Sequence, residues 1–511
     1  MPHPGAPLPL RLRRVSGLAL ALALMAGTDL ASAQPTADAA GAAPTGAADP
    51  CAAGGQDGGA GADQAASEAC RDQDPGERRL RPQRAAQNPE RGGFEGFAVA
   101  GGVSGLYTDN LAGTAEGEEA SAYAPQVAVV FAQRRHNWRA NIEAAVQQLI
   151  YDDERFEDET VPAATALLGV ESPGADVEWI LANRTGQAVV DPLAANNPEN
   201  RETVSSTLAG PVANFQPFER TQIQLGAFAG DYRRLDEGDS SRRWIGQAAI
   251  VRQVRPTIWL GLEGEYLDAQ ARSEMEEDYN REAAYVTGRA VGAFTEVEGA
   301  VGHVWIETDA GLEDSGTAGW LAAQRELGAH SLRMDLRRDT TDPGFRLVET
   351  LGAQARGGPE LLSVLTATAQ ISTSEEAELA WLWSAPRVGT RLGTRWRDEN
   401  YLDAPFDRKQ TRTTLSARYE LLPTQTVRGA ISRGEITFQA NEREDTFDEV
   451  GLAYLWRVGA LTRLSLEAGY REVESSNPLF NFEETAVALT LVYGAPVAAD
   501  ALTPLSSGAP R

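Results

Sequence analysis

Lysine is almost missing from this 511-residue chain, because Lys409 is the only one. A phosphate-binding loop of the Walker type ends in a lysine, so the sequence excludes that class of nucleotide-binding enzyme. Histidine and cysteine are also scarce, with four and two residues. Zinc sites draw most of their ligands from these two residue types. We therefore expect no metal site and no cofactor.

Positive charge is in short supply. The chain has 46 lysines and arginines against 73 aspartates and glutamates, which gives a net charge of −27. Without residues 1–33, which hold three arginines and one aspartate, the balance is 43 against 72, or −29. A surface of this sign repels phosphate, so nucleic acid is not an expected partner.

Long apolar runs are absent as well. The first segment has three arginines between residues 11 and 14, a short apolar run over 15–26, and Ala31-Ser32-Ala33 before Gln34. These features are typical of a secretory signal peptide over residues 1–33, with cleavage after Ala33. The alternative, a membrane anchor, needs about 20 apolar residues. Because no later segment resembles a transmembrane helix, the exported chain could enter a membrane only as strands.

Residues 34–93 consist mainly of Ala, Gly, Pro, Asp and Gln and hold almost no large apolar side chain. Such a stretch cannot bury enough surface to offset the entropy lost on ordering. We expect a disordered periplasmic extension. Cys51 and Cys70 lie within it. An oxidising periplasm permits a disulfide between them, and the sequence leaves open whether they are bonded.

From Phe94 onward, apolar and polar residues alternate with a period of two. The stretch 258–266 shows this pattern, with apolar Ile258, Leu260, Leu262 and Tyr266 alternating with Gly261, Glu263 and Glu265. The stretches 388–397, 412–421 and 464–471 repeat it. Successive residues of a strand point to opposite faces, so each segment predicts one apolar wall and one strongly polar wall.

Short and long connections alternate between these segments. The short ones are predicted at Arg135-His136-Asn137, Asn183-Arg184, Gln216-Pro217, Arg255-Pro256, Phe294, Gly328, Gly357-Gly358-Pro359, Ala385-Pro386-Arg387, Leu422-Pro423-Thr424 and Val458-Gly459-Ala460. The long ones are acidic, as in 152–159, 274–280 and 442–449. This asymmetry is typical of an outer-membrane β-barrel.

Ten short turns, with one strand before and one strand after the hairpins, predict 22 strands, and an even number is expected for a bacterial barrel. Because strand boundaries are the weakest part of such predictions, we expect roughly 18–22 strands in one large antiparallel transmembrane barrel over residues 94–494. The last strand would cover 482–493, with Val487, Leu489, Leu491 and Tyr493 facing lipid. Residues 495–511 would form a C-terminal tail.

Aromatic residues gather beside the predicted short turns: Phe131, Trp138, Trp179, Phe215, Phe218, Trp259, Trp383, Tyr419 and Trp456. At one height of a barrel they would form an interfacial girdle. The alternative is the core of a soluble β-sandwich, which alternates in the same way. A sandwich of this length would divide into domains, and the sequence shows no linker after residue 94.

Four segments resemble a known family: Gly105-Leu106-Tyr107-Thr108-Asp109-Asn110-Leu111, Asn141-Ile142-Glu143, Ala175-Asp176-Val177-Glu178-Trp179-Ile180-Leu181 and Val190-Asp191-Pro192. They are similar to the outer-membrane β-barrel porins found with exopolysaccharide-synthesis and PEP-CTERM protein-sorting systems of Gram-negative bacteria. The resemblance implies an outer-membrane location and a role in polysaccharide export. It supplies no catalytic residues.

Catalytic residues are not apparent. Beyond residue 33 the histidines are His136, His303 and His330, and no Gly-x-Ser-x-Gly or His-Glu-x-x-His motif accompanies them. A hydrolase needs a nucleophile, a base and an orienting group within reach of one another. We therefore expect no enzyme. No acidic loop has the spacing of a defined calcium site.

The polar wall is the candidate site. Its pore-lining candidates are Arg333, Arg337, Arg391, Arg395, Arg397, Arg412, Arg418, Glu263, Glu265 and Glu467, with Arg428, Arg433 and Glu378 on or near the same positions. Rings of charged side chains set the selectivity of water-filled pores. The arginines could attract an anionic polymer. The alternative is that they pair with facing carboxylates and only solvate the interior.

These features predict a porin-like pore or conduit in the cell outer membrane, with a link to exopolysaccharide export. Its expected partners are outer-membrane lipid, lipopolysaccharide, the barrel assembly machinery, and exopolysaccharide or its export proteins. The alternative is a non-conducting structural or adhesion barrel of the cell surface. A receptor with an internal plug is disfavoured, because 34–93 is too short and too poor in apolar residues to fold as one.

Overall fold

The computed structural model describes residues 94–111, 113–114, 117, 119–152, 156–174, 176–190, 200–235, 240–272, 278–342, 371–402, 405–499 and 502. The predicted signal peptide, the predicted extension with its two cysteines and the predicted turn at Gly357 lie outside these residues. Among the described residues, no helix is long and apolar enough to cross a membrane.

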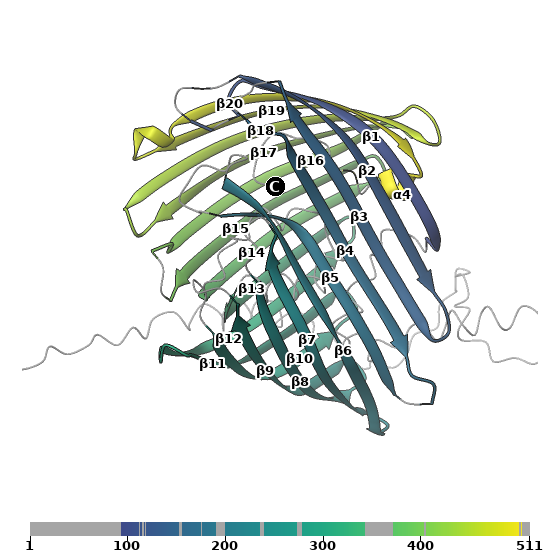
Figure 1. Ribbon diagram of the computed structural model, residues 1–511. Coiled ribbons are helices and arrows are strands. Elements are labelled where there is room, and N and C mark those ends of the chain that lie inside the picture. The colour runs from purple at the N-terminus through teal and green to yellow at the C-terminus, as the bar shows by residue number, and fades with distance from the viewer. Residues whose placement is uncertain are drawn as a thin grey trace, which may run out of the picture. The chain divides into compact units, whose positions relative to one another are not determined.

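Twenty antiparallel strands make up nearly all of the described chain (Figure 1). They are β1 (Gly96–Thr108), β2 (Ala120–Arg134), β3 (Trp138–Tyr151), β4 (Glu159–Glu171), β5 (Val177–Val189), β6 (Arg201–Phe218), β7 (Thr221–Arg234), β8 (Ser240–Arg255), β9 (Ile258–Ala271), β10 (Tyr279–Val291), β11 (Thr295–Thr308), β12 (Glu313–Leu327), β13 (His330–Thr341), β14 (Ser372–Ala385), β15 (Val388–Tyr401), β16 (Arg408–Leu422), β17 (Gln425–Phe438), β18 (Arg443–Arg457), β19 (Thr462–Ser475) and β20 (Phe482–Gly494). A 3₁₀ turn, η6 (Pro478–Phe480), and a short helix, α4 (Pro496–Ala499), complete the described elements.

The sheet closes on itself. Each strand pairs with the next along the chain, and β1 also pairs with β20, from Ala100 opposite Gly494 to Thr108 opposite Ala486. On the closing seam the hydroxyls of Ser104 and Thr490 lie 2.8 Å apart. The predicted all-β barrel is confirmed, and its strand number falls inside the predicted range.

Among the described residues, nine short turns connect the strands on one side of the barrel, and the closed sheet has 20 strands rather than the counted 22. The pair Asn183-Arg184 lies inside β5, and the turn before it covers 172–176, where Gly174 has a φ of +73°. β6 runs to Phe218, which moves the turn predicted at Gln216-Pro217 to residues 219–220. The stretch 442–449 is also not a loop, because β18 begins at Arg443.

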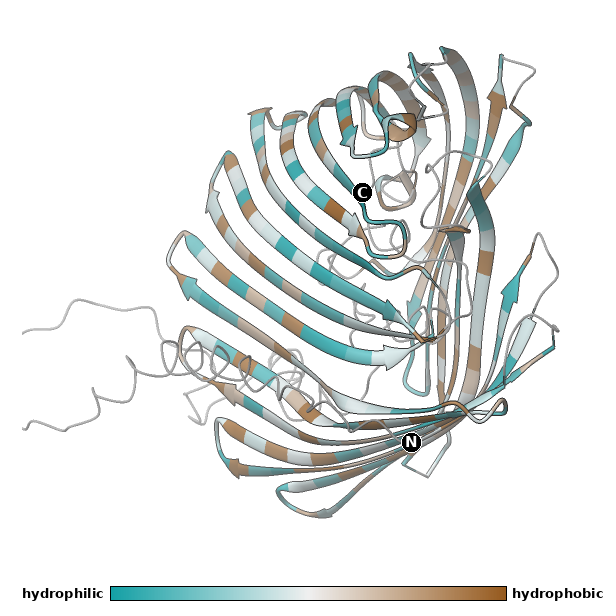
Figure 2. Cartoon of the chain, turned by 90° about the vertical axis from the view of Figure 1, so that its left-hand side faces the viewer, coloured by the Kyte–Doolittle hydropathy of each residue, from teal (hydrophilic) through white to brown (hydrophobic). Residues whose placement is uncertain are grey.

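The two faces of the wall differ in chemistry, and Figure 2 shows polar and apolar residues alternating along the strands. One face exposes large apolar side chains, for example Leu262 (59%), Ile431 (58%) and Leu452 (57%). The predicted lipid-facing residues of β20 are on this face and exposed: Val487, Leu489, Leu491 and Tyr493. A core inside a sandwich would bury these side chains.

The predicted aromatic girdle is present with one exception. The residues that share the apolar face or lie at its turns are Phe131, Trp138, Trp179, Phe215, Phe218, Trp383, Tyr419 and Trp456. Trp259 was assigned wrongly, because it alternates with Leu260 and points to the opposite face. It is 8% exposed, and the Arg289 guanidinium lies 5.2 Å from the centroid of its ring.

The chain continues past β20 and turns onto the polar face. The amide of Ala495 donates to the carbonyl of Val99 at 3.0 Å. Ala498 and Ala499 of α4 then pack with Leu502 against small side chains of β1 and β2, among them Ala100 and Ala128. The first residues of the predicted tail therefore belong to the packed structure of the barrel.

At some glycines the neighbouring strand is so close that a Cβ atom would overlap it. A Cβ at Gly302 would overlap the carbonyl oxygen of Ala284 and the ring of Tyr285, whereas a Cβ at Gly451 would meet nothing within 4 Å. We predict that Gly302→Ala destabilises the barrel by about 1–3 kcal/mol through overpacking. Gly451→Ala should change stability by under about 0.5 kcal/mol. Urea unfolding of the refolded protein in lipid vesicles measures both, and equal midpoints would contradict the prediction.

Candidate functional site

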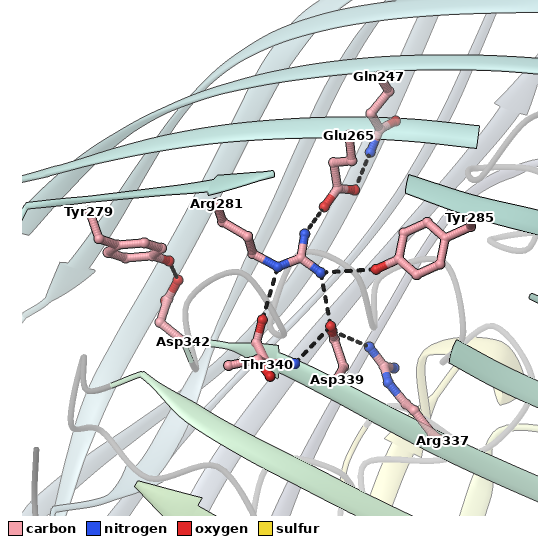
Figure 3. A network of polar contacts seen from close by, with 9 residues as sticks. All are labelled: Gln247, Glu265, Tyr279, Arg281, Tyr285, Arg337, Asp339, Thr340 and Asp342. Atoms are coloured by element: carbon pink, nitrogen blue, oxygen red, sulfur yellow. Dashed lines mark hydrogen bonds and ion pairs between the residues drawn. The ribbon is translucent and has the colours of Figure 1, made fainter. Parts of the chain in front are cut away.

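The polar face is the inside of the barrel. Arg281 of β10 contacts Asp339 of β13, although two other strands lie between them. Side chains of non-adjacent strands can meet in this way only on the concave side of a curved sheet. Figure 3 shows these side chains pointing toward one another. The strand registers then assign every other residue of each strand to the same interior.

All ten candidate residues fall on this inner face. The registers connect Arg333, Arg337, Arg391, Arg395, Arg397, Arg412, Arg418, Glu263, Glu265 and Glu467 to the positions of Arg281 and Asp339. Arg428 and Glu378 share it. Arg433 was assigned wrongly, because Gly434 opposes the inward Arg412, so Arg433 points outward, where it pairs with Asp448 at 3.6 Å.

Every candidate arginine has a carboxylate partner. The pairs are Arg333 with Asp335 (2.6 Å), Arg337 with Asp339 (3.4 Å), Arg412 with Glu449 (2.6 Å), Arg418 with Glu420 (3.4 Å), and Arg391, Arg395 and Arg397 with Glu378, Glu376 and Glu399. The arginines and the carboxylates thus neutralise each other locally, as the alternative account expected.

Four arginines keep exposed side chains on the inner face, three of them despite their ion pairs. Arg333, Arg391 and Arg418 keep 44%, 50% and 54% of their side chains exposed. Arg428 is exposed directly opposite Arg418 and has no ion pair among the described residues. Each lies three or four residues from the short-turn end of its strand. These four residues form what we term the arginine arc.

Glutamates occupy the neighbouring part of the wall. Glu263 of β9 and Glu296 and Glu298 of β11 lie within five residues of the short-turn end, on the inner face. Arg289 pairs with Glu296 at 2.9 Å. The interior near this end is therefore positive along β13–β17 and negative along β9–β11.

A buried network joins β9, β10 and β13 (Figure 3). Arg281, whose side chain is 2% exposed, donates to Asp339 (2.8 Å), the carbonyl of Thr340 (2.9 Å), the Tyr285 hydroxyl (3.2 Å) and Glu265. Gln247 of β8 donates to the other oxygen of Glu265 at 3.2 Å. Of the network drawn in Figure 3, the sequence singled out only Glu265 and Arg337, which pairs with Asp339 at 3.4 Å.

A second buried pair lies beside it. Arg243 of β8 donates to both carboxylate oxygens of Asp342, at 2.6 and 3.1 Å, and Tyr279 donates to the same carboxylate. Asp342, which follows β13, is fully buried. The chain leaving β13 therefore reaches across the inner face toward β8. The sequence analysis did not single out Arg243 or Arg281, because no sequence signal joins strands this far apart.

The histidines lie apart from this polar interior. His136 is in a short turn, and His303 faces outward, with its ring centroid 4.6 Å from that of Trp305. His330 begins β13 and stacks on Trp381, with the centroids 5.6 Å apart. Within the described residues, no group of three or more His, Cys, Asp or Glu could hold a metal ion.

No protein-family model and no curated protein matches the chain. Among solved structures, it is similar to the FrpB iron transporter of Neisseria meningitidis, with 10% identity, 80% of this chain and 83% of that chain covered, and a TM-score of 0.43. It is also similar to OpdK of Pseudomonas aeruginosa, solved with vanillate, with 12% identity, coverage of 79% and 99%, and a TM-score of 0.35. The function is therefore argued from the geometry of this chain.

The buried network predicts unequal effects of removing two inner arginines. Arg281→Gln removes the buried cation that Asp339 and Glu265 share and should destabilise the barrel by about 3–5 kcal/mol. Arg333→Gln breaks an exposed pair on the same wall and should cost under about 1 kcal/mol. Thermal unfolding of both variants in detergent, followed by circular dichroism, tests this. A smaller effect for Arg281→Gln than for Arg333→Gln would contradict the assignment of the network.

Proposed function

We propose that the chain spans the outer membrane and forms a water-filled pore for anionic hydrophilic solutes. The observation that carries this proposal is the opposition of two walls in one closed barrel: exposed apolar side chains outside and exposed ionic side chains inside. A closed barrel satisfies all strand hydrogen bonds without water, as a hydrocarbon environment requires. Barrels of this size are too wide for their own side chains to fill.

The membrane assignment draws on two further features. A signal peptide over residues 1–33 would export the chain, and the alternation of short and long connections matches outer-membrane barrels. The first strand begins at Gly96 and the last strand ends at Gly494, both at the short-turn side, which is the periplasmic side in bacterial barrels. The partners would be lipid, lipopolysaccharide and the barrel assembly machinery.

The arginine arc sets the sign of the solute. Its exposed guanidinium groups near the periplasmic mouth would concentrate anions and repel cations. An acidic exopolysaccharide has the matching charge, and the sequence resemblance is what proposes it as cargo. The export machinery would then be a further partner.

A second candidate function is a non-conducting structural or adhesion barrel. The observation in its favour is the pair between Arg243 and Asp342, which brings the chain leaving β13 across the inner face of β9–β12. A barrel closed in this way would contact the cell surface through its loops and pass no solute. Absence of any conductance in planar bilayers would favour this candidate.

The arginine arc predicts anion selectivity. In a potassium chloride gradient across a planar bilayer, the reversal potential of the wild type should indicate preference for chloride. The double variant Arg391→Glu/Arg418→Glu reverses two charges of the arc, so the reversal potential should shift strongly toward cation preference.

Arg433→Glu is the matched control, because Arg433 is exposed on the outer face of a neighbouring strand. Its reversal potential should equal that of the wild type. The proposal fails if the double variant keeps the wild-type selectivity, or if the control shifts it equally.

A further inference from the structure

One large aromatic side chain is exposed on the inner wall. Trp320 of β12 shares the inner face, because it lies directly opposite the inward Arg337, and it is 41% exposed. Among the described strand residues that point inward, only Trp320 and Leu382 combine a large apolar side chain with exposure of this order. Other inward aromatic residues, such as Trp259 and Phe447, are buried.

The indole of Trp320 has an open face. Its inward neighbours on β12 are Ala318 and Ala322, and opposite it on β11 stands Ala300. Small side chains on three sides cannot cover the ring. Trp320 makes no ring contact or hydrogen bond with any described residue, so its indole N–H is also available as a donor.

Charged groups border the fourth side. Arg337 stands opposite Trp320 on β13, and directly opposed residues of antiparallel strands have Cβ atoms about 5 Å apart. The guanidinium donates to Asp339 and keeps 36% of its side chain exposed. Asp335 and Glu298 occupy diagonal positions on the two neighbouring strands. Apolar surface beside a few polar groups is the usual composition of a small-molecule site.

We propose that Trp320 and Arg337 form a binding subsite for an acidic sugar in the lumen. A pyranose ring has one apolar face of C–H groups, which fits a single exposed indole, and polar edges, which fit the charged groups around it. A carboxylate on the sugar would pair with Arg337. A flat aromatic acid would have an apolar second face left in water here, because no ring of a described residue contacts Trp320. The inference rests on the proposed pore and names its substrate class.

The test uses the full-length refolded protein in planar bilayers, with trigalacturonate as the acidic probe, maltotriose as the neutral sugar and benzoate as the aromatic acid. Block is scored as a fraction of the open current of each variant. Trigalacturonate should block the wild type most strongly. Trp320→Ala should raise the half-blocking concentration of trigalacturonate at least tenfold. Trp320→Phe, which keeps a ring, should raise it less.

Two further variants separate the contributions. Arg337→Gln should abolish the preference for trigalacturonate over maltotriose, because it removes the charge that recognises the carboxylate. Trp179→Ala is the matched control, because Trp179 is an exposed tryptophan (56%) on the outer face, and block should equal that of the wild type. The inference is overturned if trigalacturonate blocks Trp320→Ala as strongly as the wild type, or if benzoate blocks the wild type better than the sugars do.

Calorimetric titration of the detergent-solubilised protein with trigalacturonate keeps the two proposals distinguishable. Binding that depends on Trp320, in a barrel without conductance, supports the subsite and contradicts the pore. Normal conductance without block or binding supports the pore and overturns the subsite. Absence of both conductance and binding overturns both.

Discussion

Closure of the sheet between β1 and β20 is the constraint on which the rest of this structure depends. A strand edge facing hydrocarbon would leave a row of unpaired amides and carbonyls, each costing several kcal/mol. The pairing of Ala100–Thr108 with residues 486–494 removes both edges. A closed sheet has only an outer and an inner face. Successive residues of each strand therefore point alternately outward and into the interior.

This division places many charged side chains on the inner face of the barrel. Charged side chains on a concave wall need partners, and the barrel supplies them both from the next strand, as in Arg391 with Glu378, and across several strands, as in Arg281 with Asp339. Where pairing is tight the groups are buried and hold the wall together. Where it is loose, at the arginine arc and beside Trp320, the groups remain open to a solute. Structural and functional charge thus lie on the same face.

The alternation of apolar and polar residues predicted most of the fold. It correctly assigned the faces of β20 and of the arginines on β13, β15 and β16, because each depends only on neighbouring residues. It failed where a strand contains polar residues that find local partners: Asn183, taken as a turn, donates to Thr207 at 2.8 Å on the neighbouring strand. It could not join Arg243 to Asp342, since that contact depends on the curvature of the whole wall. Trp320 was missed because small residues around it blur the alternation.

The central claim is that neighbouring residues of one strand face lipid and water in turn. The measurement uses a chain in which Cys51 and Cys70 are replaced by serine and a single new cysteine carries a fluorescent label in lipid vesicles. The labelled positions are the pairs Leu262 and Glu263, Leu392 and Arg391, and Leu466 and Glu467. The account predicts that nitroxide lipids quench the label at each leucine, whereas aqueous iodide quenches it at each charged position. Quenching of both members of a pair by the same agent would contradict it.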